Sequence, residues 1–118
     1  MRTKHIIGIL VLLALMLPAS PAHAGGVVSI CDEAHLVAAL AGGGTVTFSC
    51  SGTITLTATI TISTNTTIDG SGRAVTISGN NAVRVFYLGV GITLALNELT
   101  IANGNVAPGG YNGGGIYN

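Results

Sequence analysis

The chain has 118 residues, of which 48% are hydrophobic and only 7% are charged, with four basic and four acidic side chains. Two of the basic residues, Arg2 and Lys4, lie at the amino terminus, so only Arg73 and Arg84 remain further along. Nucleic-acid binding needs many cationic side chains to displace the counterions of the phosphate backbone. Two arginines do not meet that need, and we exclude nucleic acid as a partner.

Residues 1–24 have the pattern of a secretory signal peptide. A basic start is followed by an apolar run over 6–17 and by the small-x-small sequence at 22–24. The run is shorter than the roughly 20 residues that cross a bilayer, although an uncleaved membrane anchor is the alternative. We expect cleavage between Ala24 and Gly25, no stable membrane span in the mature chain, and a secreted or cell-surface location.

Two cysteines, Cys31 and Cys50, follow the expected cleavage site. Because exported proteins meet an oxidising environment, we expect a disulfide between them. A bridge closing a loop of about 20 residues contributes roughly 3 kcal/mol in the chain-entropy model. The alternative is a metal pair, for which His35 is the nearest further ligand, and we predict no metal site and no cofactor.

Residues 32–41 are rich in helix formers, begin with two acidic residues and are followed by three glycines. This pattern predicts one short helix with Leu36, Val37 and Leu40 on a single face. The glycines at 42–44 end it. We expect segment 25–44 to hold this helix as a cap over the open end of a stack of strands.

After the glycines, apolar residues alternate with threonine or serine, which is the period of a half-buried strand. The apolar members of the first three alternating runs are Val46 and Phe48, then Ile54 and Leu56, then Ile60 and Ile62. Further strands are expected at 83–88, 92–96 and 115–117.

A short phrase recurs as Thr-Ile-Asp-Gly at 67–70, Thr-Ile-Ser-Gly at 76–79 and Thr-Ile-Ala-Asn-Gly at 100–104. Short strands with glycine or asparagine turns indicate a β-solenoid, a sandwich or a barrel. The Asp-Gly and Asn-Gly pairs are also hairpin signals, which favour an antiparallel meander. The irregular spacing favours a solenoid, whose corners should carry the recurring asparagines Asn65, Asn80, Asn81, Asn103, Asn105, Asn112 and Asn118.

Several segments share their order with one family. They are Cys-Asp-Glu-Ala at 31–34 with Ala-Ala-Leu at 38–40, Gly-Gly-Thr-Val-Thr-Phe at 43–48, Thr-Thr-Ile-Asp-Gly-Ser-Gly at 66–72, and Leu-Thr-Ile at 99–101. Together they resemble the bacterial secreted proteins with right-handed parallel β-helix repeats, whose fold is similar to that of pectin lyases. The closing Gly-Gly-Gly-Ile-Tyr-Asn at 113–118 resembles a repeat of polymorphic outer-membrane proteins and related adhesins.

This resemblance implies an all-β fold, a right-handed parallel β-helix, with residues 45–118 as the first coils of a longer solenoid. It implies a structural or adhesive role at a surface, with an unknown surface ligand for which carbohydrate is a candidate. The rival is a carbohydrate-active protein, lyase-like or carbohydrate-binding, whose active residues lie in further coils.

Catalytic residues are not evident from the pattern. Asp69 is read as a turn-former that bonds its own backbone, although Asp69 and Glu98 on adjacent coils would give the two carboxylates of a glycosidase. Arg73 and Arg84 are read as solvated charges, with pairing to either carboxylate as the alternative. His35 lacks the partners of a nucleophile-base pair, so we predict no catalytic residue.

Two other surface features have competing interpretations. Tyr87, Tyr111 and Tyr117 are suited to stacking on sugar rings or to packing at the edges of coils. The threonine rows at 45/47, 53/55/57 and 59/61 are typical of the wet face of strands. If aligned on consecutive coils, they would instead form a flat hydroxyl array for binding ice or another lattice.

Overall fold

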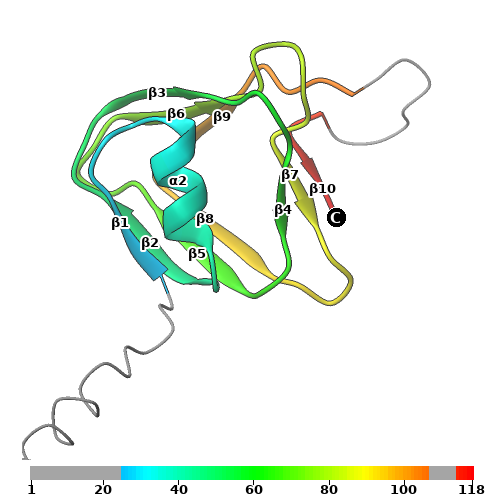
Figure 1. Ribbon diagram of the computed structural model, residues 1–118, viewed down its shortest axis with the longest axis horizontal. Coiled ribbons are helices and arrows are strands. Elements are labelled where there is room, and N and C mark those ends of the chain that lie inside the picture. The colour runs from blue at the N-terminus through cyan, green and yellow to red at the C-terminus, as the bar shows by residue number, and fades with distance from the viewer. Residues whose placement is uncertain (1–24, 107–113) are drawn as a thin grey trace, which may run out of the picture.

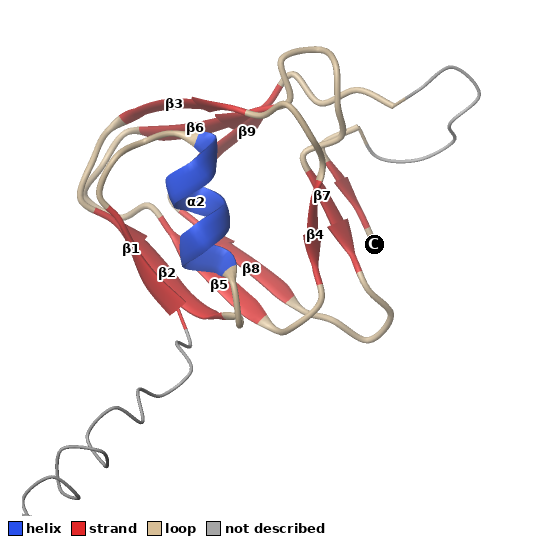
Figure 2. Cartoon of the chain, in the orientation of Figure 1, coloured by secondary structure: helices blue, strands red, loops and turns tan. Residues whose placement is uncertain are grey.

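The computed structural model describes residues 25–106 and 114–118, and most of this part is β-strand with one short helix (Figures 1 and 2). The expected signal peptide at 1–24, Tyr111 and Asn112 lie outside the described residues. The elements are β1 (Gly25–Val28), α2 (Glu33–Leu40), β2 (Gly44–Phe48), β3 (Gly52–Thr55), β4 (Ile60–Ile62), β5 (Thr66–Asp69), β6 (Val75–Ser78), β7 (Phe86–Leu88), β8 (Leu94–Asn97), β9 (Thr100–Ala102) and β10 (Ile116–Tyr117).

The strands form three sheets in which every pairing is parallel, with the orders β1-β2-β5-β8, β3-β6-β9 and β10-β7-β4. From β2 onward the chain visits the three sheets in turn, so each sheet receives every third strand. The antiparallel meander is therefore wrong. The Asp-Gly pair shows why: Asp69 ends β5, and the chain then turns toward β6 in a different sheet instead of returning beside β5.

We call each set of three consecutive strands, one from each sheet, a level. The first level is β2, β3 and β4, the second is β5, β6 and β7, and the third is β8, β9 and β10. Figure 2 shows the three sheets around a common interior, with α2 lying across the opening at one end. The helix thus lies over one end of the interior that the three sheets enclose.

Side chains of like character stack between levels because the strands are in register. Ile54, Ile77 and Ile101 pair in one sheet, and Val46, Ile68 and Leu96 pair in another. The recurring phrases at 76–79 and 100–104 lie side by side in this way, with Thr76 beside Thr100. The phrase at 67–70 belongs to a different sheet.

The core lies between the three sheets and under the helix. Its fully buried side chains come from β1, α2 and the first two levels, and they include Val28, Leu36, Ile54, Ile77 and Phe86. The corresponding residues of the third level, among them Leu96, Ile101 and Ile116, are only partly buried. The first two levels therefore provide most of the apolar burial that stabilises the fold.

Helix α2 begins at a well-formed cap. Asp32 accepts a 2.8 Å hydrogen bond from the backbone N–H of His35, which satisfies one of the free donors of the first turn. Leu36, Ala39 and Leu40 face the core. The expected position of Val37 on this face is wrong, because its side chain is 47% exposed and Ala39 takes its place.

Three consecutive glycines join α2 to β2 with left-handed backbone angles, φ being 88° at Gly42, 78° at Gly43 and 83° at Gly44. A side chain at Gly43 would also meet the neighbouring level, because an added Cβ would lie 2.8 Å from the carbonyl oxygen of Asn65. The glycine run therefore provides both the turn and the close approach of the helix end to the second level.

Asparagines lie at the corners, as the sequence predicted for several of them. Asn80, Asn81 and Asn103 have φ of 57°, 56° and 50°, in the left-handed region that asparagine tolerates. Asn65 links levels directly, since its carbonyl oxygen accepts from the Gly44 N–H at 3.1 Å and its Oδ1 accepts from the Thr93 N–H at 2.9 Å.

Three elements differ from the sequence expectation. Strand β1 was not predicted, because its two glycines and two valines show no alternation with polar residues. The strand expected at 83–88 is confined to Phe86–Leu88, and the one expected at 92–96 runs from Leu94 to Asn97. In both cases the preceding residues form the corner that leads into the strand.

Candidate functional site

The outer surface of the sheets is organised in columns, because side chains that point outward stack between levels just as the core residues do. One column is Thr47, Asp69 and Asn97. A second is Thr53, Thr76 and Thr100. A third is Thr61, Tyr87 and Tyr117. These columns are the candidate binding surfaces of the described chain.

The carboxylate of Asp69 organises the turn that follows β5. Its Oδ1 accepts hydrogen bonds from the backbone N–H of Ser71 at 2.9 Å, from the Ser71 hydroxyl, and from the Asn97 Nδ2 at 3.1 Å. The Ser71 hydroxyl, then its backbone N–H, lower the pKa of Asp69, with a smaller contribution from Asn97. The expected role of Asp69 as a turn-former is confirmed, and the bond from Asn97 was not foreseen.

The structure does not place Asp69 and Glu98 as a register pair. Asn97 is the residue beside Asp69, and Glu98 follows it in a corner with φ of 50°. Among the described residues, Arg73 forms no ion pair with either carboxylate, whereas the His35 Nδ1 lies 2.7 Å from the Asp32 Oδ1. A glycosidase-like pair of carboxylates is thus not assembled by the strand register.

The two cysteines form the expected disulfide, with an S–S distance of 1.99 Å and a Cα–Cα distance of 5.8 Å. Both sulfurs are therefore bonded to each other and neither is a thiolate ligand for a metal, which makes the metal-pair alternative wrong. Within 25–106 and 114–118, no group of three or more His, Cys, Asp or Glu side chains is placed to hold a metal ion.

His35 and Glu33 have structural contacts at the helix start. The Nδ1 of His35 lies 2.7 Å from the Asp32 Oδ1, and the backbone N–H of His35, then its ring, lower the pKa of Asp32. Glu33 reaches the corner between β3 and β4, where it accepts from the Thr57 hydroxyl at 2.7 Å and the Thr57 N–H at 2.8 Å. Sequence reasoning missed this anchor, since Glu33 and Thr57 are distant in the chain.

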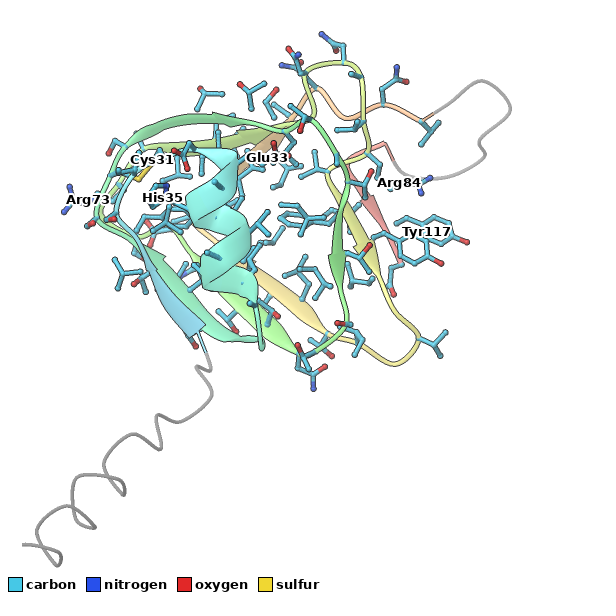
Figure 3. The ribbon with its side chains drawn as sticks, viewed as in Figure 1. Cys31, Glu33, His35, Arg73, Arg84 and Tyr117 are labelled. Carbon is cyan, nitrogen blue, oxygen red and sulfur yellow. A yellow bond between two sulfur atoms is a disulfide. The ribbon has the colours of Figure 1, made fainter. Side chains whose placement is uncertain are left out.

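The aromatic column carries the most distinctive arrangement on the surface. The rings of Tyr87 and Tyr117 are stacked, with centroids 5.1 Å apart and an angle of 11° between their planes. The guanidinium carbon of Arg84 lies 4.8 Å from the centroid of Tyr117. Figure 3 shows Arg84 and Tyr117 together on the outside of the molecule, on the side opposite Cys31 and His35.

The threonine rows of the first level do not repeat on the next two levels. Only the column through Thr53 keeps threonine at all three, whereas Thr55 is followed by Ser78 and then Ala102. Thr47 is followed by Asp69, and Thr61 by Tyr87. A regular hydroxyl array is thus limited to a single column in the described levels.

No helix of the described residues is long and apolar enough to cross a membrane. Gly25 is the first residue of β1 and is buried, whereas Ala24 lies outside the described residues.

Fold and surface together define this chain as a mostly β protein built of parallel sheets, with one short helix and one disulfide. Comparison with protein-family models, with curated proteins and with solved structures finds no match.

Proposed function

We propose that this chain is an exported right-handed parallel β-helix that acts as a structural or adhesive surface-binding scaffold rather than as an enzyme. The observation that carries the proposal is the order of the strands, which enter three parallel sheets in turn and keep their register over three levels. Each level is then one coil. Connections between parallel strands of one sheet are right-handed in the great majority of proteins, which supports the hand.

The outward columns support a binding role over catalysis. They present hydroxyl, amide and aromatic groups and one carboxylate, that of Asp69, whereas a lyase or glycosidase of this architecture needs clustered carboxylates. The carboxylates of Asp32, Glu33 and Asp69 are already engaged in the hydrogen bonds that hold the cap and one turn. This arrangement uses the acidic groups to shape the scaffold.

The disulfide supports export, because such bonds persist mainly in oxidising compartments. Export is tested by mass spectrometry of the chain recovered from the medium of an exporting host. We expect a mature protein that starts at Gly25. Recovery of the chain with residues 1–24 attached would contradict the proposed signal peptide.

The surface-binding role is tested by co-sedimentation of the purified chain with bacterial cells and with insoluble polysaccharides. We expect the oxidised chain to sediment and the reduced, denatured chain to remain in solution. The same mixtures are analysed for newly released saccharides and for the ultraviolet absorbance of unsaturated sugar products. Steady product formation would overturn the scaffold role in favour of the carbohydrate-active rival, and absence of sedimentation would overturn it altogether.

A further inference from the structure

We propose that the exposed ring of Tyr87, with Thr61 beside it, is a stacking site for a pyranose ring of a β-linked polysaccharide. This inference rests on the proposed surface-binding role and names the site and the ligand class. It concerns the outer face of the sheet β10-β7-β4, where Thr61, Tyr87 and Tyr117 are consecutive in register.

The two faces of the Tyr87 ring have different surroundings. Strand β7 lies between β10 and β4, so Tyr117 and Thr61 flank Tyr87 on opposite sides. The Tyr117 ring covers one face at a centroid distance of 5.1 Å. The other face is turned toward the side of Thr61, and Tyr87 remains 40% exposed.

The space on that second face is suited to one flat ring. Neighbouring strands are about 4.8 Å apart, which is close to the separation of stacked rings. An aromatic residue at position 61 would extend the stack, but Thr61 is much shorter and is exposed. A ligand ring resting on Tyr87 would therefore lie above Thr61, in the place of the missing third aromatic.

The chemistry of the site matches a sugar. A pyranose with equatorial substituents presents axial C–H groups on its faces, and these pack on an aromatic face, while its hydroxyls meet polar groups at the ring edge. Thr61 in β4 and Thr59 just before this strand provide hydroxyls, and no acidic residue occurs in β4, β7 or β10. A β-1,4-linked glucose chain has this ring geometry at every unit.

The platform is also held in place before a ligand binds. Tyr87 is fixed by its stack on Tyr117, and the Arg84 guanidinium lies over the Tyr117 ring. Both tyrosines are positioned by paired strands, so little side-chain freedom remains to be lost on binding.

The test measures binding of cellohexaose to the purified full chain by titration calorimetry and by the chemical shifts of the tyrosine ring protons. We expect Tyr87→Ala to weaken binding by about tenfold, as the loss of one aromatic stacking contact implies. Tyr87→Phe should retain most of the affinity, because it keeps the ring face. Val90→Ala is the control, since Val90 is fully exposed in the turn after β7 and should bind like the parent.

A second variant keeps the inference testable if Tyr87→Ala does not fold. Thr61→Tyr fills the proposed ligand position with a third stacked ring, so we expect an unchanged or higher Tm together with loss of the shift that cellohexaose causes in the Tyr87 ring protons, because the sugar can then reach only the new ring. An unaltered cellohexaose-induced shift of the Tyr87 ring protons in Thr61→Tyr, or unaltered binding in a folded Tyr87→Ala, would overturn the inference, as would a parent chain that does not bind cellohexaose. If the parent chain does not bind cellohexaose, co-sedimentation with cells tests the scaffold role separately. A chain that still sediments with cells would lose only the proposed sugar site and not the scaffold role.

Discussion

Glu33, the first residue of α2, binds Thr57 through both carboxylate oxygens: Oε1 accepts from the Thr57 hydroxyl at 2.7 Å and Oε2 accepts from the Thr57 N–H at 2.8 Å. The Ala58 N–H donates to Oε2 as well, at 3.3 Å. The helix start is thereby joined to the corner between β3 and β4, in the first level. This contact explains how a helix of eight residues keeps its position over the sheets.

Replacing Glu33 by Gln should lower the Tm, because an amide has one oxygen and cannot accept from Thr57 and Ala58 as a charged carboxylate does. The matched control is Glu98→Gln, which makes the same chemical change in a corner of the third level. We expect the control to leave the Tm within experimental error. Equal effects of the two substitutions, measured by circular dichroism, would show that the Glu33 contacts do not hold the helix.

Stability should fall in acid. Hydrogen bonds from Thr57, His35 and Ser71 lower the pKa of Glu33, Asp32 and Asp69 below the ordinary values near 4. The unfolded chain then binds protons more readily, so the stabilisation is complete above the unfolded pKa values and is lost as pH falls through the folded ones.

The measurement is the Tm between pH 7 and pH 2. We expect a plateau above about pH 5 and a decline below about pH 4. Glu33→Gln should show a shallower decline, because one of the three carboxylates no longer titrates. A Tm that rises on acidification would contradict the direction of the pKa changes.

Removing the disulfide should destabilise the chain by about 3 kcal/mol, since Cys31 and Cys50 are 19 residues apart and the bridge restricts the unfolded chain. The double variant Cys31→Ser with Cys50→Ser is compared with the oxidised parent by urea denaturation. Reduction of the parent serves as the control and should reproduce the loss. A bridge-free chain as stable as the parent would mean that the cap is held by α2 packing and the Glu33 contacts alone.

The stacked isoleucines test whether core burial decreases from the second level to the third. Ile77 is fully buried between Ile54 and Ile101, so Ile77→Ala should cost about 3 to 4 kcal/mol through lost transfer energy and a cavity. Ile101→Ala makes the same change one level on, where the side chain is only partly buried. We expect roughly half the cost there, measured by urea denaturation, and equal costs would contradict the burial gradient.

The glycines with left-handed backbone angles differ in what surrounds them. Gly43 and Gly72 have φ of 78° and 77°, but an added Cβ meets Asn65 and Thr64 at Gly43 and nothing within 4 Å at Gly72. Gly72→Ala should therefore cost only the backbone penalty of about 1 to 2 kcal/mol. Gly43→Ala should cost clearly more, and a comparable loss at both positions would show that the close approach at Gly43 relaxes easily.

Local patterns in the sequence were sufficient to predict the elements that depend on interactions between neighbouring residues. The helix, expected over 32–41 and observed at Glu33–Leu40, and its glycine end follow from helix propensity and the glycine run, and the alternation around Val46, Ile54 and Ile60 follows from the period of a strand. The turn at Asp69 is likewise local, because its carboxylate bonds a residue only two positions away.

Which strand lies beside which was decided by the tertiary structure. The Asp-Gly and Asn-Gly corners are compatible with hairpins, and only the joint burial of the apolar faces between three parallel sheets selects the observed order. The same holds for the bond between Glu33 and Thr57 and for the stack of Tyr87 on Tyr117, whose partners are separated by 24 and 30 positions. Contacts of that kind leave no periodic signal in the chain, because they arise from the register between levels and not from the spacing of neighbours.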